Sequence, residues 1–76
     1  GLLGLMRVLA RELGPGGVRV NAIAPGLVET RFAGALFADR EAYDAILSRV
    51  PLGRHGQPDD IAGAAVFLCS AASAYI

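Results

Sequence analysis

Side chains that could carry out chemistry are few in this sequence of 76 residues. It contains one histidine (His55), one cysteine (Cys69), two tyrosines (Tyr43 and Tyr75) and seven carboxylates, and all seven basic residues are arginine. A general base needs a proton to abstract within hydrogen-bond reach. Because His55 stands in the loop-like stretch PLGRHGQPDD, an exposed loop histidine is the favoured interpretation. We therefore expect no catalytic residue within the chain.

Metal binding and thiol chemistry are also disfavoured by the spacing of the candidate residues. The sequence has no His-x-x-x-His, Cys-x-x-Cys or Asp-x-Asp-x-Asn pattern, so no metal site is expected. Cys69 lies in an uncharged stretch, where a thiol behaves as a small apolar residue. Asp59 and Asp60 stand where a helix is expected to begin, and the helix dipole explains them better than paired acid and base chemistry does.

The stretch that could bind a ligand is NAIAPGLVET, from Asn21 to Thr30, which places a Pro-Gly turn at the end of a predicted strand. In open α/β sheets, ligands bind at the carboxyl ends of the strands. Gly26 lets the backbone approach a flat ring, Val28 can offer its main-chain amide and carbonyl, and Thr30 supplies a hydroxyl. A nucleotide would fit there. The alternative, in which Thr30 only caps a helix and Gly26 only makes a turn, stays open on these residues alone.

The elements that must position this stretch begin with a helix expected over Gly1–Leu13, whose apolar arc is wide enough to be covered on two sides. The run Gly14–Gly17 should end it. The alternation in Val18–Ala24 predicts a strand, and no other segment makes a convincing partner for it. Because an unpaired strand leaves its backbone groups without hydrogen bonds, we expect the chain to be a piece of a larger fold.

After the Pro-Gly turn, the pattern predicts mainly helix. A short helical stretch is expected over Phe32–Phe37, and a helix over Arg40–Val50 with Asp39 as its N-cap. Pro51–Gln57 should be a connector. The last helix should begin at Pro58 and run to about residue 72, and its uncharged body is expected to be buried.

Composition limits the partners and the compartment. The chain is 54% hydrophobic and 18% charged with no formal net charge, which excludes a disordered segment and disfavours nucleic acid or an anionic membrane as partner. The longest uncharged run, residues 61–76, is shorter than the ~20 residues that span a bilayer. A single cysteine excludes an internal disulfide and favours a cytoplasmic location.

Two blocks of the sequence resemble the short-chain dehydrogenase/reductase family, in particular classical members such as the 3-oxoacyl-acyl-carrier-protein reductases. The block GLLGLMRVLARELGPGGVRVNAIAPGLVET resembles the family's long helix, Gly-rich turn, Arg-Val-Asn strand and Pro-Gly cofactor loop, in that order. The block PLGRHGQPDDIAGAAVFLCSAASAYI resembles its next connector and helix. Between residues 33 and 49 the resemblance is weakest.

The resemblance implies an α/β fold, in which this chain is a piece of a doubly wound parallel-sheet (Rossmann-like) domain with the order helix, strand, helices. Residues 1–76 would be the C-terminal segment of one dinucleotide-binding domain, without its N-terminal half and final strand. The implied cofactor is NAD or NADP. Pro25, Gly26 and Leu27 would line the nicotinamide pocket, Val28 would hold the carboxamide through its backbone, and Thr30 would bond the carboxamide or a pyrophosphate oxygen.

The activity implied by the resemblance is interconversion of an alcohol and a carbonyl by hydride transfer. Residues 31–53 would form a lid over a small-molecule or acyl-carrier-bound substrate. The family's catalytic Ser, Tyr and Lys would lie upstream of Gly1, so the chain alone should be inactive. The whole enzyme should be a homodimer or homotetramer in which the first helix contacts another subunit. Two alternatives remain: a stand-alone α-rich module that binds a partner protein, and a truncated gene product without function.

Overall fold

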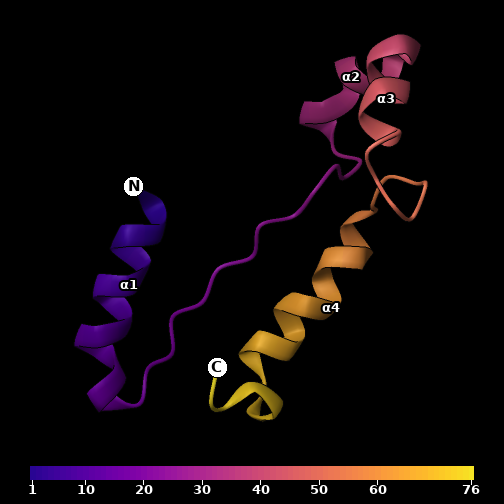
Figure 1. The fold of residues 1–76 in the computed structure, drawn as a ribbon. Coiled ribbons are helices and arrows are strands. Elements are labelled where there is room, and N and C mark those ends of the chain that lie inside the picture. The colour runs from indigo at the N-terminus through magenta and orange to yellow at the C-terminus, as the bar shows by residue number, and fades with distance from the viewer. The chain divides into compact units, whose positions relative to one another are not determined.

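The computed structural model describes the backbone of residues 1–76 and every side chain except that of Phe32. The chain divides into two compact units. Unit 1 consists of Gly1–Ala24 and Ala64–Ile76, and unit 2 is Pro25–Gly63. The ribbon is helical over most of both units (Figure 1).

Unit 1 begins with the predicted first helix, α1, which spans Leu2–Leu13. A 3-10 turn over Gly14–Gly16 follows it. Gly17 then adopts a φ of 85°, a left-handed conformation that glycine accepts without steric cost. The Gly-rich run therefore ends the helix as the sequence predicts. Leu2, Leu3, Leu5 and Val8 remain exposed on α1.

The segment Val18–Ala24 corrects the predicted strand. It runs without coiling after α1 (Figure 1), but the structure assigns no strand there. A strand is defined by hydrogen bonds to a neighbour, and the described backbone bond of this segment joins Val18 N to Leu13 O at 3.3 Å. Residues of α1 and of the last helix nevertheless border the segment. Grooves of about 370 and 380 Å³ lie along it, the first lined with α1 and the second with residues 65–69.

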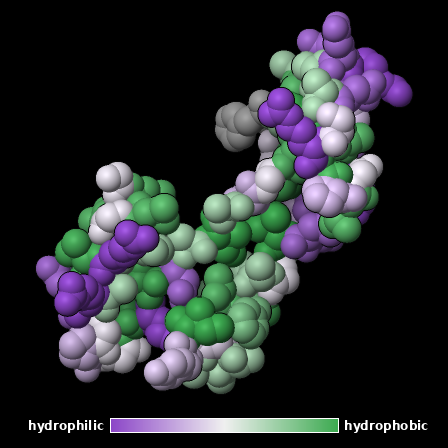
Figure 2. Space-filling model, viewed as in Figure 1, coloured by the Kyte–Doolittle hydropathy of each residue, from purple (hydrophilic) through white to green (hydrophobic). Residues whose placement is uncertain are grey.

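Helix α4, at Pro58–Cys69, corrects the predicted burial of the last helix. It ends about three residues earlier than predicted, and a 3-10 turn follows at Ala71–Ser73. No residue of α4 is buried, and Val66 is 69% exposed. Among the described side chains, the buried one is that of Ser73. Figure 2 shows apolar atoms at the surface of both units, because 76 residues supply too little chain to cover them.

Unit 2 contains the elements that surround the candidate site. A 3-10 turn at Arg31–Ala33 leads into α2, Gly34–Ala38, and then into α3, Arg40–Leu47. The predicted stretch Phe32–Phe37 is thus split between a 3-10 turn and a short α-helix. Helix α3 ends three residues before its predicted end, Val50. The amides of Arg49 and Val50 donate to the carbonyl oxygens three residues back, so the chain leaves the α-helical pattern after Leu47.

Side-chain caps begin two of these elements: the cap by Asp39 is the predicted one, and the cap by Thr30 is the alternative that the sequence left open. The Asp39 carboxylate accepts a hydrogen bond from the amide of Ala42 at 3.2 Å, at the start of α3. Thr30 Oγ1 accepts one from the amide of Ala33 at 3.3 Å. In the part of the chain that the structure describes, no helix is long and apolar enough to cross a membrane.

Candidate functional site

The candidate site is the loop from Pro25 to Thr30, which begins unit 2. Its central residue, Val28, forms an isolated parallel bridge with Gly56. The amide of Gly56 donates to Leu27 O at 2.8 Å, and the amide of Glu29 donates to Gly56 O at 2.9 Å. In a parallel bridge of this form, the amide and carbonyl of the central residue point away from the partner. The backbone groups of Val28 are therefore directed away from Gly56.

Space lies beside this loop. The Cβ that a larger residue would add at Gly26 meets no described atom within 4 Å. An open hollow of about 440 Å³ adjoins the loop and the end of α3. This volume is within the range of ligand pockets. The hollow is lined by Gly26, Leu27, Ala45, Ile46, Arg49 and Val50.

Pro25 and Thr30 stand at the two ends of the loop. Pro25 is the first residue of the loop, and its ring fixes the backbone φ there. Thr30 is the N-cap of the 3-10 turn that follows. In that hydrogen bond the hydroxyl oxygen is an acceptor, which leaves the hydroxyl proton of Thr30 available to donate. The capping role and a ligand contact are therefore compatible.

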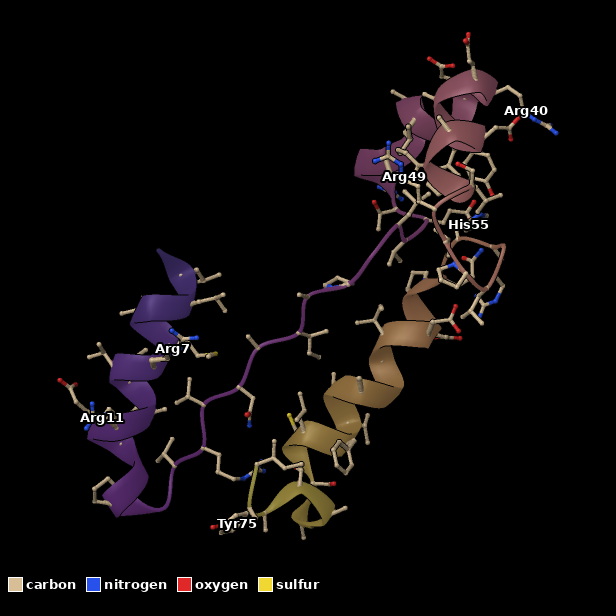
Figure 3. The ribbon with its side chains drawn as sticks, viewed as in Figure 1. Arg7, Arg11, Arg40, Arg49, His55 and Tyr75 are labelled. Carbon is tan, nitrogen blue, oxygen red and sulfur yellow. The ribbon has the colours of Figure 1, made fainter. Side chains whose placement is uncertain are left out.

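His55 is not the exposed loop histidine that the sequence suggested. Its side chain is 24% exposed, and its Nδ1 lies 2.7 Å from the phenol oxygen of Tyr43. The ring of Phe37 meets the imidazole edge to face, with centroids 4.7 Å apart. His55 lies in the connector between α3 and α4 (Figure 3). The connector folds back onto α2 and α3, so the imidazole is half-buried.

The second ring nitrogen of His55, Nε2, has polar neighbours. His55 Nε2 lies 3.4 Å from a carboxylate oxygen of Glu29, which also accepts a hydrogen bond from the side chain of Gln57 at 2.6 Å. Sequence reasoning missed the pairing of Tyr43 and Glu29 with His55. Nothing in the linear pattern indicates it, because 12 and 26 residues separate them from His55, and only the path of the chain brings them together.

An ion pair fixes the end of the connector. Arg54 Nη1 lies 2.9 Å from Asp60 Oδ2, and the amide of Gln57 donates to the same oxygen at 2.8 Å. The hydrogen bond from Arg54, together with that from Gln57, lowers the pKa of Asp60. Asp60 is the third residue of α4 and reaches back to the residue before the helix, which is one half of a capping box. Asp60 therefore has this local role, beyond the dipole interaction that the sequence predicts.

The remaining candidates of the sequence analysis stand apart from the loop. Cys69 is exposed at the end of α4, in contrast to the predicted apolar environment. Its helix is uncovered in this chain, which is why the thiol reaches the surface. Among the described residues, no group of three or more His, Cys, Asp or Glu side chains converges on a point that could hold a metal ion.

Comparison with known proteins places these features in a family. The model of the family described as Enoyl-(Acyl carrier protein) reductase matches residues 1–76. Over 76 residues the chain is 47% identical to L-rhamnose 1-dehydrogenase (NAD(P)(+)) of Azotobacter vinelandii and 49% identical to 3-oxoacyl-[acyl-carrier-protein] reductase of Vibrio harveyi. In both cases the alignment covers all of this chain and 30% of the relative.

A solved structure gives the same result for the fold. A candidate 2-deoxy-D-gluconate 3-dehydrogenase from Agrobacterium tumefaciens, determined with bound NADP, superimposes with a TM-score of 0.92 and 55% identity. The match covers 96% of this chain and 30% of that one, and such neighbours have the Rossmann fold. The chain thus spans about 30% of the length of the relatives it matches. With a family match over its whole length, the chain belongs to the short-chain dehydrogenase/reductase family.

Proposed function

We propose that residues 1–76 form the nicotinamide side of the cofactor site and the substrate lid of an NAD(P)-dependent oxidoreductase that interconverts an alcohol and a carbonyl. The cofactor, when bound, supplies or accepts the hydride. Both units would belong to one dinucleotide-binding domain. The catalytic Ser, Tyr and Lys would come from another part of that domain, since this sequence contains no lysine.

The observation that carries the proposal is the bridge between Val28 and Gly56. It holds the loop by the backbone of Leu27 and Glu29 and leaves the amide and carbonyl of Val28 directed away from Gly56. A carboxamide has one donor group and one acceptor group, so it can bond to both. The residues present therefore fit the nicotinamide end of the cofactor.

The other loop residues complete the proposed contacts. Pro25, Gly26 and Leu27 would line the nicotinamide pocket, and the open space at Gly26 supports close approach of a flat ring. Thr30 would donate its free hydroxyl proton to the carboxamide or to a pyrophosphate oxygen. The apolar part of the hollow, from Ala45, Ile46 and Val50, would exclude water from the reacting atoms.

The substrate would be a small molecule or an acyl group on a carrier protein. The named relatives act on a sugar and on a 3-oxoacyl group, and both names are compatible with a carbonyl at the reacting centre. We further propose a cytoplasmic enzyme that is a homodimer or homotetramer. The apolar residues left exposed on α1, among them Leu2 at 80%, support a covering subunit or a covering part of the same domain.

Cofactor titration tests the proposal on the full-length protein, by which we mean the polypeptide encoded by the complete reading frame that contains residues 1–76. NADPH and NADH are the probes, with nucleotide fluorescence as the readout. Gly26→Val should weaken binding by about tenfold or more, since its methyl groups would occupy the space of the ring. Gly16→Ala is the matched control, because its Cβ also meets no described atom and lies outside the loop.

A second pair of variants tests whether the hydroxyl of Thr30 contributes to nucleotide binding. Thr30→Val should weaken binding of the same nucleotide by about tenfold, and Thr30→Ser should restore most of the affinity, because serine keeps the hydroxyl. A full-length protein that binds neither nucleotide would contradict the proposed function. Binding that is unchanged in Gly26→Val would contradict the placement of the nicotinamide.

A further inference from the structure

Five side chains of unit 2 form a continuous cluster beside the candidate loop. We call it the His55 cluster. It contains the rings of Phe37, Tyr43 and His55 and the polar side chains of Glu29 and Gln57.

Both nitrogens of the imidazole have polar partners in the cluster. Nε2 of His55 lies 3.4 Å from a carboxylate oxygen of Glu29 and 3.2 Å from the side-chain nitrogen of Gln57. Nδ1 forms a hydrogen bond with the phenol of Tyr43 across 2.7 Å. In this arrangement His55 connects α3, which carries Tyr43, to the loop residue Glu29.

Packing of the aromatic ring of Phe37 surrounds this connection on the apolar side. Phe37 of α2 packs edge to face against the imidazole and tilts against Tyr43 at a centroid distance of 5.4 Å. The imidazole is mostly shielded, at 24% exposure, whereas the carboxylate of Glu29 is 53% exposed. A hydrogen bond shielded from water is stronger than an exposed one and costs more to break.

The backbone next to His55 holds the candidate loop. Gly56, the next residue, exchanges hydrogen bonds with Leu27 and Glu29, which flank Val28. Three consecutive residues, His55 to Gln57, thus contact α3 and the loop. The side chain of His55 bonds Tyr43 of α3, and the side chains of His55 and Gln57 both contact Glu29. The backbone of Gly56 bonds the backbone of the loop. These contacts therefore link the loop to α3 through a single short segment.

We propose that His55 is a positioning residue that couples the cofactor loop to the lid helices α2 and α3. Occupation of the backbone groups of Val28 fixes the loop. The loop fixes the segment from His55 to Gln57 through Gly56, and the bond from Tyr43 to His55 then orders α3. This inference rests on the proposed function for the identity of the ligand, and the contacts that would carry the coupling are those between the loop, residues 55–57 and α3.

The first measurement needs no cofactor. Amide hydrogen exchange of α3, Arg40–Leu47, is followed in the free full-length protein. Tyr43→Phe keeps the ring against Phe37 and removes the hydroxyl, so exchange in α3 should become about tenfold faster. Tyr75→Phe is the matched control, since Tyr75 belongs to unit 1, whereas α3 belongs to unit 2, so that the substitution should leave the exchange of α3 unchanged.

The second measurement tests the coupling with NADPH and NADH as probes. In the unsubstituted protein, the bound nucleotide should slow exchange in α3 by about tenfold, because coupling between two sites is typically of this size. In His55→Phe this protection should be lost. The nucleotide dissociation constant should change by less than about threefold, because His55 is not among the residues proposed to contact the nucleotide. His55→Asn places an amide, which can accept or donate a hydrogen bond, near the position of Nδ1 and should restore part of the protection.

The outcomes separate the two proposals. If exchange in Tyr43→Phe equals that in Tyr75→Phe, His55 does not hold α3 and the inference is wrong, whatever the enzyme does. If nucleotide protects α3 equally in His55→Phe and in the unsubstituted protein, the coupling takes another route and the inference is also wrong. If the protein binds neither nucleotide, the proposed function fails, and the exchange of the free protein still decides whether His55 holds α3.

Discussion

The guanidinium of Arg19 donates to the carbonyl oxygen of Ser73 at 2.9 Å and to its hydroxyl oxygen at 3.0 Å, although 54 residues separate the two in the sequence. The same guanidinium bonds the carbonyl of Ser70 at 3.4 Å and that of Ile76 at 3.3 Å, and Asn21 donates to Ile76 O at 2.9 Å. The extended segment therefore holds the C-terminal turns of unit 1 through side chains. These bonds satisfy carbonyl groups that follow the end of α4.

Removal of the Ser73 hydroxyl should weaken this attachment. Besides accepting from Arg19, the hydroxyl lies 2.7 Å from the carbonyl of Phe67, and the side chain is 1% exposed. Ser73→Ala removes a buried hydroxyl together with its hydrogen bonds and should lower the free energy of unfolding of the full-length protein by about 1 kcal/mol in a urea titration. Ser48→Ala, which removes an exposed hydroxyl bonded to Ala45 O, is the control. Equal effects of the two substitutions would contradict the role assigned to Ser73.

The 76-residue chain studied alone should lack cooperative unfolding. None of its described apolar side chains is buried, so no core exists to make the helices unfold together. Far-UV circular dichroism should show helix that melts gradually over a broad range, and a dye that binds exposed apolar surface should fluoresce with the native chain. A sharp two-state transition from a monomer would instead favour the alternative of a stand-alone module.

The start of α4 should depend on pH through Asp60. Its pKa is lowered in the folded chain, chiefly by the hydrogen bond from Arg54, so the unfolded state binds the proton more readily. The stabilisation is therefore fully present above the ordinary aspartate value of about 4 and is lost as the pH falls through the lower, folded value. Thermal midpoints of the full-length protein, measured from about pH 6 to about pH 3, should fall less steeply for Asp60→Asn than for the unsubstituted protein.

Asp59, the neighbouring acidic residue, provides the control for Asp60. Asp59→Asn removes an equal charge from the same helix turn, without removing the bond to Arg54. Its thermal midpoint should follow that of the unsubstituted protein over the same pH range. If Asp60→Asn and Asp59→Asn give identical profiles, the dipole of α4 alone accounts for both residues, as the sequence first suggested.

The sequence predicted the local elements well. Periodicity and caps located α1, α3 and the start of α4, and the predicted cap Asp39 is confirmed by its hydrogen bond. Thr30 also caps a turn, which is the role that the sequence had left open beside a ligand contact. These features depend on residues three or four positions apart, whose geometry a helix fixes by itself. The prediction of a strand at Val18–Ala24 was wrong because alternation of residue types is a local pattern, whereas a strand also needs a neighbouring strand to bond with.

What only the tertiary structure decided is which side chains meet across turns and loops. The sequence by itself determined the candidate loop, including Gly26 and Val28, and the resemblance to a family that the comparisons confirm. It could not indicate that His55 bonds Tyr43, or that Gly56 bridges Val28. The physical reason is that such contacts depend on the path of the chain through several turns. Small differences in the backbone dihedral angles of each turn add up, and a local sequence pattern does not fix their sum.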